Sequence, residues 1–510
     1  MLSMIDAFLD RVTMYRLVVY SLAGIFVWSL ACSALGLIAP QPWEIFFSAA
    51  TVVLVGWGIN YVFANITGAV TNSESALITG LILALIVPVN FPNNFLFLVL
   101  AGVFSSASKF LLTVEKQHLF NPAAAVVVAA ALLTDSAATW WVGVPALLPA
   151  VLVAGFLIVR RTQREGMVLT FLTVYFALVG GAAFVRTGNP AAVFQVYSIA
   201  VFSSAVFFFA VIMLTEPLTA PGKKSLRLVF AGLVGALYAT PSLRLGGIGF
   251  TPEWALVLGN VFSFAVNPKY RFVLPLDRKE QLSKNALAFL FRPADMVDFF
   301  AGQYMEWTLP HEGVDSRGNR RYFSLASSPT EDDLMVVARF PDKPSSYKRT
   351  MQVMNPGQTI VAAQLSGDFV LPEGNEKLVF IAGGIGIAPF RSMIKYLVDK
   401  RVQKDVVLIY SEHNRSDFLF ADLFDQAAEM GVQTVYVVTD PKAEESGWKG
   451  KIGHIDAKMI TELVPDFGER KFFVSGPQLL VGAAKKTLES LGLPRAQIVT
   501  DYFPGYAGAN

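Results

Sequence analysis

Cysteine, histidine and charged residues are all scarce in this 510-residue chain. It contains one cysteine, Cys32, and four histidines, and only 16% of its residues are charged. One cysteine excludes a disulfide within the chain and a cysteine-ligated iron–sulfur cluster, which needs several thiolates. Haems stacked across a membrane use paired histidines, yet His118 is the only histidine before residue 267. We therefore assign no metal ligands and expect no bis-histidine haem.

The net charge of +2 gives no reason to expect a nucleic-acid partner, because no basic cluster goes beyond what a membrane boundary explains. What the chain has in excess is apolar sequence. Hydrophobic residues make up 54% of it, which is too much for an ordinary soluble protein. Residues 1–266 hold only 12 of the 41 Lys and Arg and 9 of the 39 Asp and Glu. This half is therefore predicted to lie in a lipid bilayer.

Ten apolar stretches in this half have the length, or nearly the length, of a membrane helix. They are residues 17–39, 43–64, 75–91, 94–113, 121–134, 141–159, 167–185, 195–215, 226–243 and 252–267. Lys and Arg collect in every second loop, and such clusters mark the cytoplasmic side. The sequence thus predicts a multi-pass protein of the cell membrane, with both termini and everything after 267 in the cytoplasm.

After residue 268 the hydrophobic period changes. Short alternating runs such as 287–291 and 334–338 predict strands of an antiparallel β-barrel over residues 269–375. From 376 to 510 the order is strand, helix, strand, which predicts an α/β doubly wound domain. Its strands are expected at 377–382, 406–410, 433–438 and 471–474. The fold class is therefore multi-domain, with an all-α polytopic membrane domain of about ten helices at 1–268.

Two motifs in the second half suggest chemistry. Glycines at 383, 384 and 386, followed by Pro389, link an expected strand to a helix, where a backbone turn can approach a pyrophosphate. A plain strand-to-helix turn is the alternative. Arg321-Tyr322-Phe323-Ser324 combines a guanidinium that can pair with phosphate, aromatic rings and a hydroxyl, which suits a flavin. An edge strand with an exposed arginine and a buried aromatic is the alternative.

Six elements together resemble the ferredoxin–NADP reductase superfamily in order and spacing, from about residue 270 to the C-terminus. They are Gly302-Gln303-Tyr304, Arg321 to Ser324, Ser345-Ser346-Tyr347, Gly367-Asp368-Phe369, the glycine loop and Ser475-Gly476-Pro477. The resemblance implies that FAD is held by Arg321, Tyr322, Phe323, Ser324, Ser346 and Gly367, with the amides and hydroxyl near Ser346 at its pyrophosphate. It implies an NADH or NADPH site made by Gly383, Gly384, Gly386, Pro389, Gly476 and Pro477. Ser324 and Ser475 would then lie beside the hydride-transfer centre.

Two details depart from that family or stay open. Many members have cysteine where this chain has Ser475, and an aromatic in their C-terminal tail covers the flavin, a role for which Phe503 is the candidate here. Ser411 and Arg415 follow an expected strand and are candidates for contact with a 2′-phosphate, while solvent-exposed polar residues are the alternative. The choice between NADH and NADPH therefore stays open.

The membrane half resembles the flavin-carrying membrane proteins of the Rnf electron-transport complex and of the sodium-translocating NADH:quinone reductase. The similar segments are 75–85, 120–123 and 215–221. Members of that family carry membrane flavin, one as FMN on a threonine of a Ser-Gly-Ala-Thr motif, which is missing from residues 186–195. FMN in the membrane half is therefore an open alternative. Asn121-Pro122 and Glu216-Pro217 interrupt apolar runs, as in a ligand site or at ordinary helix ends.

We expect an NAD(P)H-dependent, FAD-containing oxidoreductase that takes a hydride from the cytosolic dinucleotide. Its electrons would enter or cross the membrane, to a quinone, a membrane flavin or an acceptor on the far side. Ion pumping follows only from the resemblance of the membrane half. The alternative function is a membrane transporter or sensor that a bound dinucleotide regulates with little turnover.

Overall fold

The computed structural model describes residues 12–67, 73–114, 117–133, 138–240, 244–245, 248–249, 251–267, 270–315, 317–440, 448 and 450–502, together with Ile5 and Leu9. The chain divides into two compact units. Val12–Tyr270 forms a helical unit, and the chain from Arg271 onward forms a unit of two sheets. Each unit is described by itself.

The helical unit consists mainly of α-helices. It also has two short antiparallel strand pairs, β1 (Thr113–Val114) with β2 (Gln117–His118) and β3 (Arg244–Leu245) with β4 (Ile248–Gly249). Its helices are α2 (Met14–Ala34), α3 (Pro42–Thr67), α4 (Ser73–Ile86), α5 (Phe95–Leu111), α6 (Pro122–Leu133), α7 (Leu148–Thr162), α8 (Glu165–Thr187), α9 (Pro190–Phe202), α10 (Val206–Phe208), α11 (Lys224–Tyr238) and α12 (Pro252–Val266), with a 3-10 turn η1 (Pro145–Leu147) before α7 and a π-helical turn η2 (Phe209–Met213) after α10. Each of the ten predicted stretches falls on one or more of these helices.

In the described part of the chain, fewer helices than the predicted ten have the length and apolar composition of a membrane span. Within the described residues, four helical segments are long and apolar enough to cross a bilayer: 14–34, 42–66, 145–162 and 165–187. The pair formed by α9 and the segment 206–213, bent by 62°, would make a fifth. The helices α4, α5, α6 and α12 fall short of the roughly 20 residues that a bilayer requires. Four or five spans are therefore supported, and ten are not.

Small residues let the helices of this unit approach one another closely. A Cβ atom on Gly80 of α4 would lie 3.0 Å from the Cα of Val53 in α3, and one on Gly102 of α5 would lie 2.9 Å from the Cβ of Val55. Close backbone approach of this kind is common among membrane helices, between which lipid supplies no hydrophobic driving force. The core of the unit is apolar and includes Phe171, Phe209 and Phe230.

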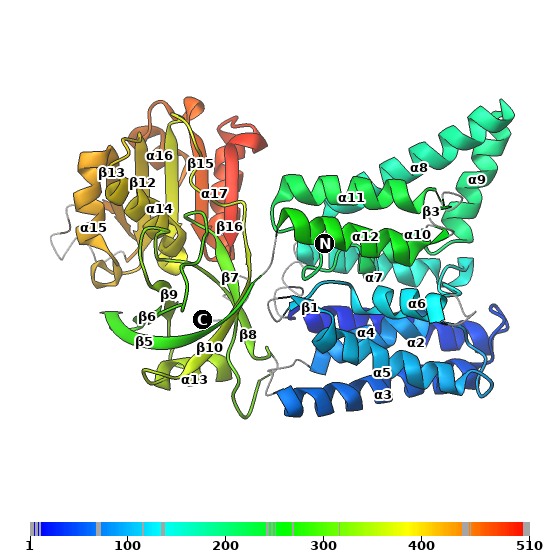
Figure 1. The fold of residues 1–510 in the computed structure, drawn as a ribbon. Coiled ribbons are helices and arrows are strands. Elements are labelled where there is room, and N and C mark those ends of the chain that lie inside the picture. Colours follow the sequence, from blue (N-terminus) through cyan, green and yellow to red (C-terminus); the bar gives the residue numbers. More distant parts are fainter. Residues whose placement is uncertain are drawn as a thin grey trace. The chain divides into compact units, whose positions relative to one another are not determined.

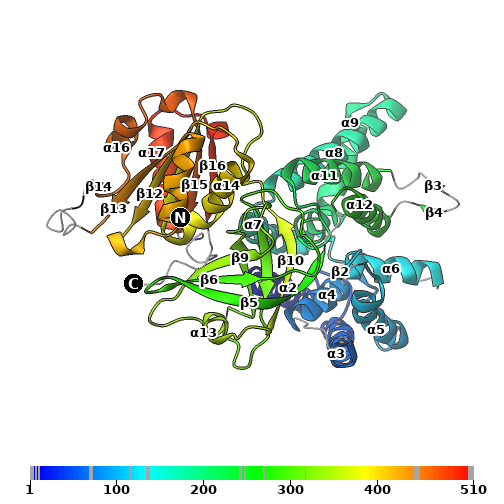
Figure 2. The same cartoon turned by 60° about the vertical axis from the view of Figure 1, so that its left-hand side comes forward.

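The first sheet of the second unit is antiparallel and six-stranded. Its strands are β5 (Arg271–Ser283), β6 (Ala286–Phe291), β7 (Tyr304–Thr308), β8 (Arg320–Ser324), β9 (Leu334–Arg339) and β10 (Thr359–Ser366), in the spatial order β8-β7-β10-β5-β6-β9. Figure 2 labels β5, β6, β9 and β10 of this sheet. Helix α13 (Ser346–Val353) lies between β9 and β10 in the sequence. Trp307, Phe289 and Phe291 fill its core. The predicted antiparallel arrangement is confirmed as a half-barrel sheet.

The second sheet is parallel, with helices on both faces (Figure 1). Its strands are β11 (Leu378–Gly383), β12 (Val406–Glu412), β13 (Val432–Val438), β14 (Lys451–Ile452), β15 (Lys471–Gly476) and β16 (Ile498–Tyr502), in the order β14-β13-β12-β11-β15-β16. Side chains alternate along each strand, so α14 (Ile387–Lys400) and α15 (Ala421–Gln426) cover one face, and α16 (Ala457–Leu463) and α17 (Gln478–Ser490) the other. The doubly wound prediction is confirmed.

Candidate functional site

Strand β8 and helix α13 bring Arg321 and Phe323 against one buried tyrosine. In the pairing of β8 with β7, Arg321 lies opposite Trp307 and Phe323 opposite Met305. The Arg321 guanidinium lies over the ring of Tyr347, 5.0 Å from its centroid. The Phe323 and Tyr347 ring centroids are 6.1 Å apart. One face of β8 therefore carries a guanidinium and an aromatic ring side by side.

The other face of β8 carries Tyr322 and Ser324, because neighbouring residues of a strand point in opposite directions. The Tyr322 hydroxyl donates to Glu306 Oε2 at 2.9 Å, and its ring packs edge-on against Tyr304 with centroids 5.7 Å apart. The Ser324 Oγ is buried without a hydrogen-bond partner among the described residues. The four residues of the predicted flavin motif therefore lie on two faces of β8, with Arg321 and Phe323 on one face and Tyr322 and Ser324 on the other.

Cations gather around the N-terminal end of α13. Burial, together with the positive charges of Arg317, Arg321 and Arg339, lowers the pKa of Lys348 from 10.5 to about 8. Its Nζ donates to the backbone oxygen of Arg339 at 2.7 Å. Burial also lowers the pKa of Arg321. Positive charges that lie close together repel one another, so an anionic ligand bound among them would be stabilised.

Ser346, the first residue of α13, is held by the loop between β7 and β8. Its backbone N donates to Asp315 Oδ2 at 3.0 Å, and its Oγ accepts from the Asp315 backbone N at 3.0 Å. His311 Nε2 lies 2.9 Å from the same Oγ. The helix cap itself is Ser345, whose Oγ accepts from the backbone N of Lys348 at 3.2 Å. The hydroxyl predicted to meet a pyrophosphate therefore already has two protein partners.

The glycine loop joins β11 to α14 at the carboxyl edge of the parallel sheet. Gly383 ends the strand, Gly384–Gly386 forms a 3-10 turn, and Pro389 lies in the first turn of the helix. Gly384 has φ +56°, which glycine adopts most easily. A Cβ on Gly383 would lie 2.4 Å from Leu480 Cδ1. Ligands bind at such an edge in open α/β sheets.

The loop that carries Gly476 and Pro477 lies directly against the glycine loop. Strands β11 and β15 are parallel neighbours, with Ala382 opposite Ser475. A Cβ on Gly386 would lie 2.4 Å from the Ser475 backbone oxygen and 2.5 Å from Gly476 Cα. The Ser475 Oγ is buried and lacks a hydrogen-bond partner among the described residues. The two predicted dinucleotide loops thus touch, backbone on backbone, beside a buried hydroxyl.

Helix α14 connects this edge to the chain that follows β8. Ser392 Oγ donates to the backbone oxygen of Ser327 at 2.6 Å, and Arg391 Nη1 donates to that of Ala326 at 3.1 Å. Arg391 also forms an ion pair with Glu331. The antiparallel and parallel sheets share one core cluster. The two sequence motifs therefore meet at one junction within the unit, through α14.

The junction contains a further link, an ion pair that the sequence did not predict. Arg339, at the end of β9, donates from Nη1 and Nη2 to the two carboxylate oxygens of Glu412, at 3.0 and 2.8 Å. The Tyr410 hydroxyl donates to Glu412 Oε1 at 3.0 Å. A Cβ on Gly384 would lie 3.6 Å from Arg339 Nη1. Arg339 therefore lies beside the turn formed by Gly384–Gly386.

Four predicted residues remain: Gly367, Ser411, Arg415 and Phe503. Gly367 follows β10 with φ +122°, and a Cβ there would lie 3.2 Å from the Tyr304 ring. Ser411 is buried in β12. Arg415 lies beyond β12 with its guanidinium 5.8 Å from the Trp448 ring centroid. Phe503 lies outside the described residues.

In the helical unit the two interrupted segments contact each other. Asn121 Nδ2 donates to Glu216 Oε2 at 2.8 Å, and Thr219 Oγ1 donates to the same oxygen at 3.1 Å. Asn260 of α12 accepts from the Asn121 backbone N at 2.9 Å and donates to the Thr219 backbone oxygen at 3.3 Å. The protein itself thus satisfies the polar groups that the helix breaks expose.

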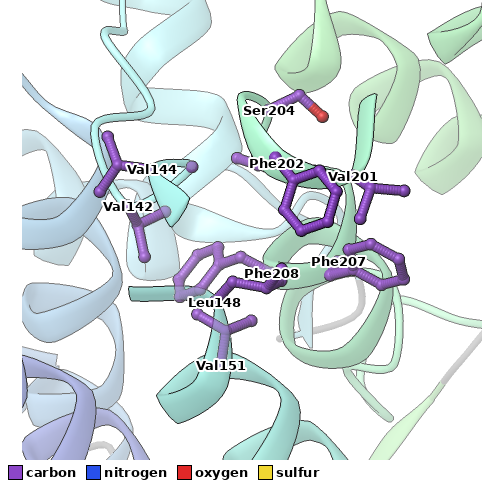
Figure 3. A pocket seen from close by; sticks show the side chains of 11 residues that line it. Val142, Val144, Leu148, Val151, Val201, Phe202, Ser204, Phe207 and Phe208 are labelled. Carbon is purple, nitrogen blue, oxygen red and sulfur yellow. The ribbon is translucent and has the colours of Figure 1, made fainter. Parts of the chain in front are cut away.

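A pocket lies where α9 breaks from α10, next to the start of α7 (Figure 3). Its lining is apolar except for Ser204, with Phe202, Phe207 and Phe208 on one side and Val142 and Val144 on the other. It encloses at most about 220 Å³ of empty space, whereas ligand pockets begin at roughly 300 Å³. This pocket is too small for the ring system of a flavin.

The residues of the sheet unit fit FAD and a dinucleotide. A cation cluster around α13 suits a pyrophosphate, and the touching loops at the sheet edge suit the backbone approach of a second one. The unpartnered hydroxyls of Ser324 and Ser475 are groups that burial makes costly unless a ligand contacts them.

Comparison with known proteins agrees with this geometry. Residues 380–486 match the model of the oxidoreductase NAD-binding domain. NADH-cytochrome b5 reductase 1 of Ajellomyces capsulatus is 30% identical over 285 residues, which cover 52% of this chain and 90% of that protein. Flavohemoprotein A of Dictyostelium discoideum is 25% identical over 45% of this chain and 59% of its own length.

Among solved structures, the Amycolatopsis cytochrome P450 reductase GcoB matches 46% of this chain and 70% of its own, at 23% identity and a TM-score of 0.41. No resemblance of the helical unit to the Rnf complex or to the sodium-translocating reductase is present among these matches. The chain belongs, through its C-terminal half, to the ferredoxin–NADP reductase-like family of the NADH-cytochrome b5 reductases, and it is an NAD(P)H-dependent, FAD-containing oxidoreductase.

Proposed function

We propose that this protein carries electrons from cytosolic NAD(P)H into or across a membrane. FAD, when bound, supplies the redox chemistry: it accepts a hydride from C4 of the nicotinamide and passes the two electrons on. The helical domain, 1–268, would lie in the bilayer. An FAD-binding domain, 269–375, and an NAD(P)-binding domain, 376–510, would lie in the cytoplasm, as would both termini.

The contact between the glycine loop and the Ser475–Pro477 loop carries the proposal. Hydride transfer requires the nicotinamide and the flavin to be held within reach of each other. Backbone contacts at Gly386 fix one loop against the other, and Ser392 fixes α14 to the segment after β8. This arrangement supports a dinucleotide on Gly383, Gly384, Gly386, Pro389, Gly476 and Pro477.

The proposed FAD site uses both faces of β8, with Arg321 and Phe323 on the face that meets α13 and Tyr322 and Ser324 on the other. Arg321 and Lys348 would neutralise the pyrophosphate, and the Phe323 ring would lie along the flavin. Ser324 and Ser475, with their buried hydroxyls, would orient the reacting rings without taking up or releasing a proton. Tyr322, Ser346 and Gly367 would complete the site, and Phe503 would cover the flavin.

The acceptor is proposed to be a quinone, a membrane flavin such as FMN, or a haem protein or other acceptor on the far side. Some relatives are reductases of cytochrome b5 by name and others are flavohemoproteins, which favours a haem protein. The four or five apolar helices and the resemblance of segments 75–85, 120–123 and 215–221 to the membrane proteins of the Rnf complex favour an acceptor within the membrane.

The test uses the full chain purified in detergent and then placed in lipid vesicles. We expect a flavin absorbance band, FAD on acid extraction, and oxidation of NADH or NADPH with ferricyanide, which takes electrons directly from flavin. A quinone analogue and cytochrome b5 should then be compared as acceptors. A chain without flavin that oxidises neither dinucleotide contradicts the proposal, whereas activity with ferricyanide alone contradicts only the link to the membrane.

A regulated transporter is the second candidate, because the 62° bend between α9 and the segment 206–213 is a feature of transporters with broken helices. In that case the dinucleotide would bind tightly and turn over slowly. Steady NAD(P)H consumption with ferricyanide therefore favours the reductase, and tight binding without consumption favours the transporter.

A further inference from the structure

The segment 311–315 contacts Ser346 and Arg321, two residues that the proposed function assigns to the FAD site. Asp315 accepts the backbone N–H of Ser346 with Oδ2, and Asp315 and Ser346 exchange a second hydrogen bond through Ser346 Oγ. His311 Nε2 lies 2.9 Å from that Oγ, and its Nδ1 lies 2.8 Å from the backbone oxygen of Leu309. Two residues of one segment thus hold the start of α13.

The same loop also holds Arg321. Its Nη2 lies 3.9 Å from Asp315 Oδ1 and makes no hydrogen bond among the described residues. Its Nη1 donates to the backbone oxygens of Arg317 at 2.7 Å, Gly318 at 3.1 Å and Arg320 at 2.6 Å. The guanidinium is therefore turned toward the loop and toward the Asp315 carboxylate.

Several interactions stabilise the ionised form of Asp315. Burial disfavours its ionised form, but hydrogen bonds from the backbone N–H groups of Ser346 and Arg317 and the charges of Arg317 and Arg321 outweigh this and lower its pKa. Asp315 is therefore a carboxylate at neutral pH. A carboxylate at a helix start beside an arginine makes the interactions that a phosphate would make there.

We propose that Asp315 competes with the FAD pyrophosphate for the start of α13 and for Arg321, so that the segment 311–315 must move away when FAD binds. This inference rests on the proposed FAD site. It follows from shared ligands: the Ser346 N–H can serve only one anion at a time, and the Arg321 Nη2, 3.9 Å from Asp315 Oδ1, has an unused donor.

The competition predicts an effect opposite to that of an ordinary binding residue. Removing the charge in Asp315→Asn weakens the internal competitor, so FAD should bind faster and on the order of tenfold more tightly, the worth of one hydrogen bond to a charged group. If Asp315 instead contacted the cofactor, the same variant would bind FAD more weakly. The sign of the change therefore decides between the two roles.

The experiment uses the full-length chain in detergent, reversibly depleted of flavin, with FAD binding followed by quenching of FAD fluorescence. Glu312→Gln is the matched control, because Glu312 is an exposed acid of the same segment and its loss changes the net charge equally. We expect tighter and faster binding in Asp315→Asn only. Equal or weaker binding in Asp315→Asn, or equal gains in both variants, overturns the inference.

Hydrogen exchange gives a second measurement that needs no variant. When FAD binds the wild-type chain, backbone N–H groups of 311–315 should exchange faster while those at the start of α13 become protected. Protection of both segments contradicts the competition. A wild-type chain that binds no FAD defeats the proposed function itself, whereas FAD binding without release of 311–315 defeats only this inference.

Discussion

The contact at Gly386 permits the sharpest test of the dinucleotide site. A Cβ placed on Gly386 would lie 2.4 Å from the Ser475 backbone oxygen and 2.5 Å from Gly476 Cα, whereas ordinary contact begins at 3.4 Å. The obstacle is backbone, not a flexible side chain, so Gly386→Ala must push the two loops apart by about 1 Å. A displacement of that size at a reacting centre costs on the order of 100-fold in rate.

The assay is NAD(P)H oxidation with ferricyanide, together with the FAD content and the melting temperature of the purified chain. We expect kcat/KM to fall roughly 100-fold while FAD content is kept, with a loss of about 1–3 kcal/mol in stability from overpacking. Gly482→Ala is the control, because a Cβ at Gly482 in α17 meets nothing within 4 Å. Should Gly386→Ala keep its kcat/KM within threefold of that control, the backbone contact does not position the dinucleotide.

Three further results are expected. A bound pyrophosphate should raise the lowered pKa of Lys348, so FAD affinity falls as pH rises above about 8, and Lys348→Met should flatten that slope in FAD titrations. In the protein without FAD, Lys348 loses its proton near pH 8 in the folded state but only near pH 10.5 in the unfolded state. The free energy of unfolding should therefore rise between pH 8 and 10.5, and a melting temperature that falls in this range contradicts the lowered pKa. Glu412→Gln removes the carboxylate that pairs with the Arg339 guanidinium. It should lower the melting temperature more than the double variant Glu412→Gln/Arg339→Met does, and equal losses refute a buried ion pair. Asn260→Ala removes two hydrogen bonds in the helical unit and should cost about 1–3 kcal/mol of stability, while ferricyanide reduction stays unchanged.

The parallel sheet was predictable because its strands are continuous apolar runs between helices. The run at 377–382 became β11, and 406–410 became β12, each within two residues. The strands β14, with two residues, and β16 were missed because neither has a hydrophobic period long enough to recognise. Local pattern thus determined the order of the elements, and the edges of the sheet came from pairing between distant segments.

Side-chain direction and long-range contacts were less predictable. Sequence order grouped Arg321, Tyr322, Phe323 and Ser324 as one motif, but strand alternation divides them between two faces. The ion pair between Arg339 and Glu412 joins residues 73 apart, so no local spacing could reveal it. In the helical unit, apolar composition placed the helices correctly, but it could not show which of them are too short to cross a bilayer alone.

These differences suggest that backbone contacts, more than side-chain chemistry, set the distance between the reacting groups. The register that places Ala382 opposite Ser475, the contact at Gly386 and the bond from Ser392 to the Ser327 oxygen all involve main-chain atoms. A serine in place of cysteine at 475 leaves each of them intact. Because hydride transfer needs correct positioning and no proton donor from the protein, replacing a hydroxyl should cost this enzyme less activity than adding one methyl group at Gly386.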